Sequence, residues 1–396
     1  MVLTILLIII YLAFISLGLP DSLLGSAWPS IYPLLDVPIS YAGIVSMIIA
    51  GGTIVSSFFS GYLIRRFGSG KVTAISVLMT AGALLGYSFS TAFYQLCLFA
   101  IPLGLGAGSV DAALNNFVAL HYKAKHMNWL HSFWGVGAMT GPLIMSYYLK
   151  KGMIFQVGYR TVSIIQFALV FIIIITLPLW KKISTNDSLD DKEQVNNQKT
   201  IGLRELLKLP GAKHALVAFF CYCAIEATIG LWSSSFMVKT HGVPIDKAAK
   251  WASLFYFGIT FGRFVSGLLA HRLNNKRMIY LGITLISLGI IIVMLPLNQL
   301  SLIIGLIIIG FGCAPIYPSL LHETPVNFGA EYSQSMMGIQ MSSAYVGTTF
   351  MPPIFGILAV KMGYSLLPIY TGILLITLIM MIRKLNKYVE IKINKN

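Results

Sequence analysis

Charged side chains are scarce in this sequence, and acidic ones are the scarcest: Asp and Glu together occupy 13 of the 396 positions. Charged residues make up 10% of the chain, whereas hydrophobic residues make up 57%. A soluble domain could not bury that much apolar surface and still present a charged exterior. The composition therefore predicts a protein that lies largely within a lipid bilayer.

Cysteine is also rare. No CxxC pair occurs, which disfavours a disulfide framework or a cysteine-based metal site. The sequence also lacks an HExxH zinc motif, a nucleotide-binding glycine loop, a candidate catalytic triad and a fused soluble domain. We therefore expect no enzymatic activity, no metal and no cofactor. The four cysteines all lie in apolar runs: Cys97, Cys221, Cys223 and Cys313.

Long apolar runs, by contrast, recur along the whole chain. Each is about twenty residues or more, enough to cross a bilayer core of roughly 30 Å. The pattern predicts an all-α membrane protein with twelve transmembrane helices. The predicted spans are 3–33, 41–65, 71–92, 94–121, 128–149, 158–180, 213–238, 246–271, 277–296, 299–321, 332–360 and 364–383.

The net charge of +15 is explained by membrane topology. With the N-terminus inside, 20 of the 28 Lys and Arg residues fall on the cytoplasmic side, seven fall outside, and Arg263 lies within a span. Cytoplasmic loops carry such an excess of basic residues. We therefore expect a multi-pass protein of the cell membrane with both termini in the cytoplasm and no nucleic-acid partner.

Short patterns recur in the two parts of the sequence at a nearly constant offset, which indicates a parallel duplication. We expect a six-helix half at residues 1–180, a polar cytoplasmic linker at 181–212 and a second six-helix half at 213–396. A short surface helix is expected near 201–207. The matching positions are Gly61 with Gly267, Gly104 and Gly106 with Gly310 and Gly312, Asp21 and Gly25 with Glu226 and Gly230, and Gly137 and Pro142 with Gly347 and Pro352.

The stretch 104–116 is the most informative part of the chain. At helical spacing, Gly104, Gly108, Asp111 and Asn115 share one face. Small residues let a neighbouring backbone approach closely. A carboxylate in such a segment should face the bundle interior or a watery cavity, because exposure to lipid is costly. This arrangement favours a transport path, although an Asp held by an Asn for packing alone remains open.

Three further charged residues are predicted to take part in proton coupling: Asp21, Glu226 and Arg263. Asp21 lies inside the membrane if the first helix runs on past Pro20, and in a loop if that helix ends earlier. Arg263 is the only basic residue well inside a span and needs a partner. That partner is either a carboxylate, Asp111 or Glu226, or a set of backbone carbonyls.

Twelve spans in two halves, with the turn after span 2 repeated after span 8, resemble the major facilitator superfamily. That turn usually reads Gly-x-x-x-Asp-Arg-x-Gly-Arg-Arg/Lys in the family, and here Arg65 and His271 occupy the acidic position of its two copies. The acid-xxx-Asn pattern of span 4 is similar to that of the fucose permease-like branch, which includes bacterial glucose/mannose permeases. Segment 130–142 is also similar to that branch, with Trp134 in place of the Asn that fucose permease uses.

This resemblance implies transport of a sugar. A pyranose presents a ring of hydroxyls that needs fixed donors and acceptors, and an apolar face that suits an aromatic ring. The candidate polar contacts are Asn115, Asn116, His131 and Gln340, and the candidate flat surfaces are Trp134, Trp232 and Tyr317.

Proton symport of a hexose or related sugar is the first function that these residues predict. A carboxylate in a dry cavity takes a proton more readily than one in water, and Asp111, followed by Glu226, is the first candidate for this role. Proton-driven efflux of a drug, sugar or metabolite is the alternative, because the same fold serves both directions. A membrane enzyme or sensor is a third class, and sodium in place of protons remains open. We expect the protein to act as a monomer with a small solute, protons and the bilayer as its partners.

Overall fold

The structure is a computed structural model that describes residues 2–122, 124–187, 203–269, 272–295 and 299–393. Within these ranges every regular element is a helix. Eleven helical segments in the described part are long and apolar enough to cross a membrane. The remaining predicted span, 128–149, corresponds to the helix Ala124–Lys150. The predicted all-α membrane fold is therefore confirmed.

The first predicted span consists of two consecutive helices. One ends at Asp21 and the next begins at Leu23, and together they form a continuous apolar segment from Leu3 to Leu34. The helical path thus continues past Pro20, as one of the two sequence interpretations required. Asp21 lies at the junction of the two helices rather than in a loop.

Contacts divide the chain into two compact units. Unit 1 comprises Met1–Gln198 and Gly242–Ser253, and unit 2 comprises Lys199–His241 and Leu254–Asn396. The start of α10 (Ile245–Leu269) belongs to unit 1, where the Ser146 hydroxyl donates a hydrogen bond to the Asp246 carbonyl at 2.8 Å.

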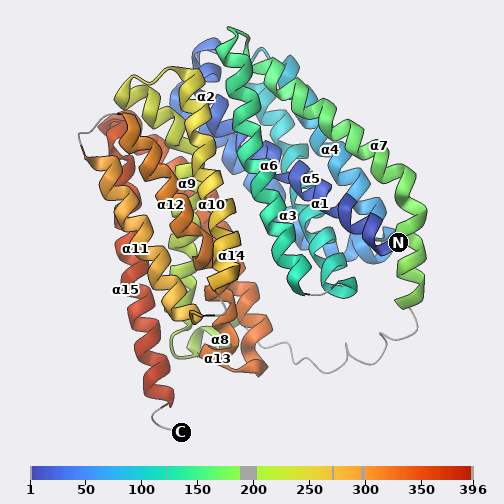
Figure 1. Cartoon of the computed structure of the whole chain (residues 1–396), viewed down its shortest axis with the longest axis vertical. Coiled ribbons are helices and arrows are strands. Elements are labelled where there is room, and N and C mark those ends of the chain that lie inside the picture. Colours follow the sequence, from blue (N-terminus) through green and yellow to red (C-terminus); the bar gives the residue numbers. More distant parts are fainter. Residues whose placement is uncertain (1, 123, 188–202, 270–271, 296–298, 394–396) are drawn as a thin grey trace. The chain divides into compact units, whose positions relative to one another are not determined.

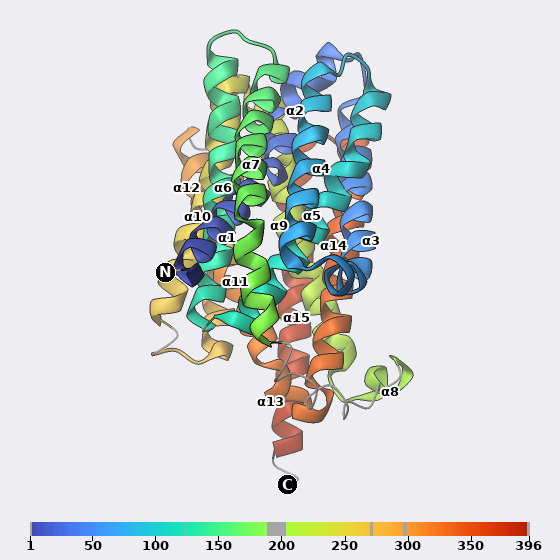
Figure 2. The same ribbon diagram turned by 90° about the vertical axis from the view of Figure 1, so that its right-hand side faces the viewer.

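Unit 1 contains the helices from blue to green in Figure 1. Its interior packs α1 on α6, α3 on α5, and α4 on both α5 and α7; Figure 2 shows α4 and α7 alongside each other. The elements are α1 (Val2–Asp21), α2 (Leu23–Leu34), the 3-10 turn η1 (Ile39–Tyr41), α3 (Ala42–Phe67), α4 (Ser69–Phe89), α5 (Phe93–His121), α6 (Ala124–Lys150) and α7 (Phe155–Asp187).

Unit 2 contains most of the remaining helices. Within it α9 packs on α14 and α15, and α11 packs on α12. The elements after α7 are α8 (Leu203–Lys208), α9 (Ala212–His241), α10, α11 (Asn275–Met294), α12 (Gln299–His322), α13 (Thr324–Phe328), α14 (Ala330–Met362), η2 (Tyr364–Leu366) and α15 (Leu367–Ile393).

The segment between α7 and α9 differs in part from the predicted linker. Helix α7 continues to Asp187, so residues 181–187 are helical rather than irregular. The short helix expected near 201–207 is present as α8. Residues 188–202 lie outside the described part of the chain.

The sequence repeat recurs in the packing of the helices. A Cβ atom on Gly104 of α5 would lie 2.2 Å from the Ile49 carbonyl oxygen of α3. In unit 2, a Cβ on Gly310 of α12 would lie 2.1 Å from the Phe255 carbonyl oxygen of α10. In each unit only glycine permits this approach. Both residues of the contact in unit 2 lie 206 positions after their counterparts in unit 1.

The contact between the first and fifth helices of each half repeats as well. A Cβ on Gly137 of α6 would lie 2.0 Å from the Ile15 carbonyl oxygen of α1. A Cβ on Gly347 of α14 would lie 2.5 Å from the Phe220 carbonyl oxygen of α9. These four glycines are therefore packing positions that bring helix backbones together, as small residues do in membrane proteins.

Candidate functional site

The clearest polar contact inside unit 1 joins Asp21, at the end of α1, to Trp134 on α6. The indole Nε1 donates a hydrogen bond to Asp21 Oδ2 at 2.7 Å. Glycine makes this contact possible, because a Cβ on Gly18 would lie 2.1 Å from the Trp134 carbonyl oxygen. The Asp21 side chain is exposed and that of Trp134 is half-buried, so both are accessible from outside the packed core.

The second polar contact lies within α5. Asn115 Nδ2 donates to the Asp111 carboxylate oxygen Oδ1 at 2.9 Å and to the Asp111 carbonyl oxygen at 3.0 Å. Their spacing of four residues places the two side chains one helical turn apart on the same face. Both are half-buried, and the charge of Asp111 acts electrostatically on Asp21. Asp21 and Asp111 of unit 1 therefore share one neighbourhood.

Two more predicted polar residues of unit 1 are accessible. Asn116 is exposed and lines a cavity of about 230 Å³ between α5 and α3, together with Ser60, Ile64 and Arg65. His131 is exposed on α6, and its ring meets the Phe14 ring edge-on at a centroid distance of 5.8 Å.

In unit 2, Glu226 is half-buried on α9 and accepts a hydrogen bond from the Tyr222 hydroxyl one turn earlier. The same hydroxyl lies 3.0 Å from the Cys313 carbonyl oxygen of α12. The ring of Tyr317 on α12 faces that of Tyr222 at 6.2 Å. Glu226 and Arg263 both act electrostatically on the Tyr222 hydroxyl, so the two opposite charges lie near the same group.

The two remaining candidates are packed away from solvent. Trp232 is 0% exposed, and its Nε1 donates to the Pro352 carbonyl oxygen at 2.8 Å. Gln340 is 1% exposed, and its Oε1 accepts a hydrogen bond from the Thr324 hydroxyl at 2.9 Å. Contacts of this kind hold helices together, and in this structure neither side chain is exposed to a solute.

Trp28 lies near the end of a span, where tryptophans commonly face the membrane–water interface. In the structure it is buried instead. It is 0% exposed, and its Nε1 donates to the Ile39 carbonyl oxygen at 2.6 Å.

Sequence reasoning did not single out Tyr222 as a functional residue. The available signal was its spacing, because a tyrosine four residues before a glutamate on a helix can reach the carboxylate. Of the two residues that replace the acid of the repeated turn, Arg65 is exposed at the end of α3; His271 lies outside the described residues.

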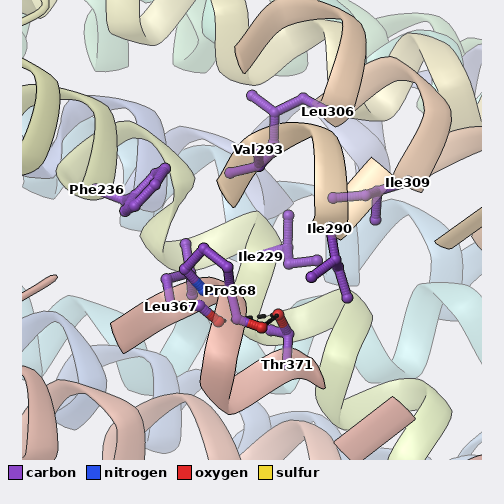
Figure 3. Close-up of a pocket in the computed structure, with 9 residues that line it drawn as sticks. All are labelled: Ile229, Phe236, Ile290, Val293, Leu306, Ile309, Leu367, Pro368 and Thr371. Atoms are coloured by element: carbon purple, nitrogen blue, oxygen red, sulfur yellow. Dashed lines mark hydrogen bonds between the residues drawn. The ribbon is translucent and has the colours of Figure 1, made fainter. Parts of the chain in front are cut away.

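A small apolar cavity in unit 2 is too small for a solute. It encloses about 20 Å³ among α9, α11, α12 and α15, which is room for about one water molecule. Its only polar side chain is Thr371, whose hydroxyl donates to carbonyl oxygens of its own helix (Figure 3). Among the described residues no group of three or more His, Cys, Asp and Glu side chains could hold a metal ion.

Two bundles of long apolar helices with a few accessible carboxylates define a multi-pass membrane protein of the transporter class. The family model of the Major Facilitator Superfamily matches residues 10–345 and 216–392. The chain therefore belongs to this superfamily of membrane transporters.

Curated relatives are distant in sequence. The chain is 22% identical over 328 residues to the glucose/mannose transporter GlcP of Bacillus subtilis, which covers 78% of this chain and 77% of GlcP. It is 22% identical over 399 residues to Bypass of stop codon protein 6 of Saccharomyces cerevisiae, covering 91% of this chain and 78% of the yeast protein. It is 20% identical to the cis,cis-muconate transport protein of Acinetobacter baylyi, covering 85% of each.

Solved structures of transporters share the fold. A mutant of the peptide transporter POT superposes with a TM-score of 0.76 at 14% identity, covering 97% of this chain and 95% of POT. A mutant of the nucleoside transporter NupG superposes with a TM-score of 0.75 at 14% identity, covering 94% of this chain and 98% of NupG.

Proposed function

We propose that the protein is a secondary active transporter that carries a hexose or related sugar across the cell membrane by proton symport with alternating access. The observation that carries the proposal is the neighbourhood of Asp21 and Asp111 in unit 1. These are two accessible carboxylates on helices that carry no other Asp, Glu, Lys or Arg, one hydrogen-bonded to an indole and the other to an amide. Carboxylates at such positions mark substrate and proton pathways.

The accessible side chains of unit 1 have the chemistry that a sugar needs. Asn115, Asn116 and His131 supply hydrogen-bond donors and acceptors for hydroxyl groups. Trp134 supplies an aromatic surface, and its indole Nε1 is already bonded to Asp21, which fixes the orientation of the ring. The similarity to a protein named as a glucose/mannose transporter supports the same substrate class.

The coupling step is assigned to carboxylates that gain and lose a proton as access alternates. Binding of sugar and proton together neutralises the site and lowers the free energy needed to enclose it. Asp111 is the first candidate and Glu226 the second. In unit 2, Glu226 and Arg263 both act electrostatically on the Tyr222 hydroxyl, and we propose that Arg263 pairs with Glu226 during the cycle.

Proton-driven efflux of a drug, sugar or metabolite is the second candidate function. The relative named for cis,cis-muconate transport favours an organic acid as the competing substrate. An efflux protein would use the same carboxylates but would exchange protons for the solute.

The proposal is tested by uptake of labelled glucose and mannose into proteoliposomes, with an inward proton gradient or with none. Asp111→Asn is compared with Asp36→Asn, a matched control at an exposed residue beyond the end of α2. We expect gradient-dependent accumulation in the parent and in Asp36→Asn. In Asp111→Asn we expect no accumulation but continued exchange of sugar.

Other outcomes contradict the proposal. Failure to take up either hexose, combined with proton-driven expulsion of a hydrophobic cation, would replace sugar symport by efflux. Accumulation of labelled muconate but not of hexose would replace the sugar by an organic acid.

A further inference from the structure

The Tyr222 hydroxyl lies between two hydrogen-bond acceptors on different helices. One is the Glu226 carboxylate on α9, its own helix, and the other is the Cys313 carbonyl oxygen on α12 at 3.0 Å. A tyrosine hydroxyl carries one proton and can donate only one full hydrogen bond. Which acceptor receives it therefore depends on whether Glu226 itself carries a proton.

Two arrangements follow from this proton count. When Glu226 is protonated, its carboxyl group donates to the Tyr222 oxygen, and Tyr222 donates to the Cys313 carbonyl. When Glu226 is ionised, the carboxylate attracts the Tyr222 proton, because a hydrogen bond to a charged acceptor is roughly twice as strong as one between neutral groups. The bond from α9 to the backbone of α12 is then lost.

Of the three groups in this hydrogen-bonded chain, the Glu226 carboxyl group is the one that a proton from solvent can reach. Glu226 is half-buried, whereas Tyr222 is 1% exposed and Cys313 is 0% exposed. Solvent can therefore reach the carboxyl group, and Tyr222 connects that group to the carbonyl of α12.

Helix α12 is easily deformed just beyond the contact. Pro315 and Pro318 lie inside it. Each proline lacks the N–H that would bond to the carbonyl four residues earlier, and prolines inside helices are the usual sites of bending. A bond to the backbone at Cys313 thus restrains α12 directly before two weak positions.

We propose that Tyr222 is a positioning residue that transmits the protonation of Glu226 to helix α12. This inference deepens the proposed function, because it rests on Glu226 as a proton-binding group. The charged and titratable groups that act on the Tyr222 hydroxyl are Glu226 and Cys223 on α9, Arg263 on α10 and Cys313 on α12. The phenol ring of Tyr317 on α12 also lies beside the Tyr222 ring, at a centroid distance of 6.2 Å.

The test is hydrogen exchange of the main-chain amides of α12 in the purified full-length protein, in mildly acidic and mildly alkaline buffer. Rates are expressed as protection factors, so that the intrinsic pH dependence of exchange cancels. In the parent we expect residues 310–320 to lose protection roughly two- to tenfold at alkaline pH, the ratio that corresponds to one hydrogen bond. No transport is measured, so the result does not depend on whether the solute is a sugar.

Three variants separate the effect of the Glu226–Tyr222–α12 connection from general effects on stability. In Glu226→Gln the amide donates to Tyr222 at any pH, so α12 should stay protected in both buffers. In Tyr222→Phe the connection is absent, so α12 should be less protected in both. Tyr370→Phe is the matched control, because it removes a tyrosine hydroxyl that donates to the Met351 carbonyl at 2.9 Å in the same unit.

The control should keep the pH response of the parent. A parental pH response in Tyr222→Phe or in Glu226→Gln would overturn the proposal, and so would a parent whose α12 protection does not change with pH. If Tyr222→Phe fails to fold, as judged by its thermal unfolding, the Glu226→Gln comparison alone still decides.

Discussion

Replacing Gly137 by alanine should disturb both the packing of unit 1 and its candidate site. A Cβ at this position would lie 2.0 Å from the Ile15 carbonyl oxygen, and Cβ contacts under 3.0 Å essentially never occur. Both contacting groups belong to helix backbones, so no side-chain rotation can relieve the clash. Helices α1 and α6 must therefore separate by about 1 Å or more near this residue.

The same separation would break the polar contact of the site. The bond from Trp134 Nε1 to Asp21 Oδ2 is 2.7 Å long, and an additional ångström takes it beyond hydrogen-bonding distance. Overpacking of this kind costs about 1–3 kcal/mol, and a hydrogen bond to a charged group contributes about 1.5–3 kcal/mol. We expect Gly137→Ala to lower the free energy of unfolding by about 2.5–6 kcal/mol and to weaken binding of the solute.

The measurement is unfolding of the purified protein in mixed micelles by titration with a denaturing detergent, beside uptake in proteoliposomes. Gly82→Ala is the matched control, because Gly82 lies on α4, is exposed, and has no atom within 4 Å of its Cβ position. That change should be neutral or stabilise the helix by up to about 1 kcal/mol. Equal stability of the two variants would refute the reasoning.

Three further predictions test the repeat and the site. Gly104→Ala and Gly310→Ala should both lower the midpoint of unfolding relative to Gly82→Ala; a loss in only one of them would contradict equivalent packing. Trp232→Phe should lower the free energy of unfolding by about 1–3 kcal/mol, because the buried Pro352 carbonyl loses the indole donor. The KM for sugar should stay unchanged. A raised KM with parental stability would assign Trp232 to the substrate site instead. Asp21→Asn keeps an acceptor for the Trp134 indole, so the KM should be retained while gradient-driven accumulation falls. Asp21→Ala removes the acceptor and should raise the KM several-fold. Identical behaviour of the two variants in uptake assays would argue against a role of Asp21 in positioning Trp134.

Much of the fold can be predicted from the sequence because the bilayer imposes a length and a composition on every span. The path of the first helix past Pro20 was one of two interpretations, and the structure selects it. The close approach at Gly104 was predicted from small residues at helical spacing, and the structure confirms it against α3. Helix α7 continues to Asp187 through a polar sequence, which composition alone assigned to the linker.

The orientation of side chains could not be predicted in the same way. A helix that is apolar on all faces gives no amphipathic pattern to mark its inner side. Trp232 and Gln340 have the right chemistry for a sugar but are buried between helices of unit 2. The contact between Trp134 and Asp21 joins residues 113 positions apart, so no local sequence pattern predicts it. Tyr222 was accessible to prediction from spacing, but its second acceptor, Cys313 on α12, was not.

The internal repeat explains which residues belong to the scaffold and which to the site. Trp28 follows Gly25 by three residues and Trp232 follows Gly230 by two. Each tryptophan is fully buried, with its Nε1 hydrogen-bonded to a main-chain carbonyl. The pairs Gly104 with Gly310 and Gly137 with Gly347 also make matching backbone contacts, so these positions build the common scaffold.

Positions of the candidate site, in contrast, differ between the halves. At the offset of 206 residues, Asp111 corresponds to Tyr317, and at the offset of 210 that relates Gly137 to Gly347, Trp134 corresponds to Ala344. Only the acid of the first helix is retained, as Asp21 in one half and Glu226 in the other, and each is bonded to an aromatic side chain. A duplicated scaffold requires equivalent packing in both halves, whereas binding of a solute does not require the same side chains in both. The divergence of Asp111 and Trp134 from their counterparts is therefore what a solute-binding role predicts, and the retained acids fit a proton-binding role that both halves share.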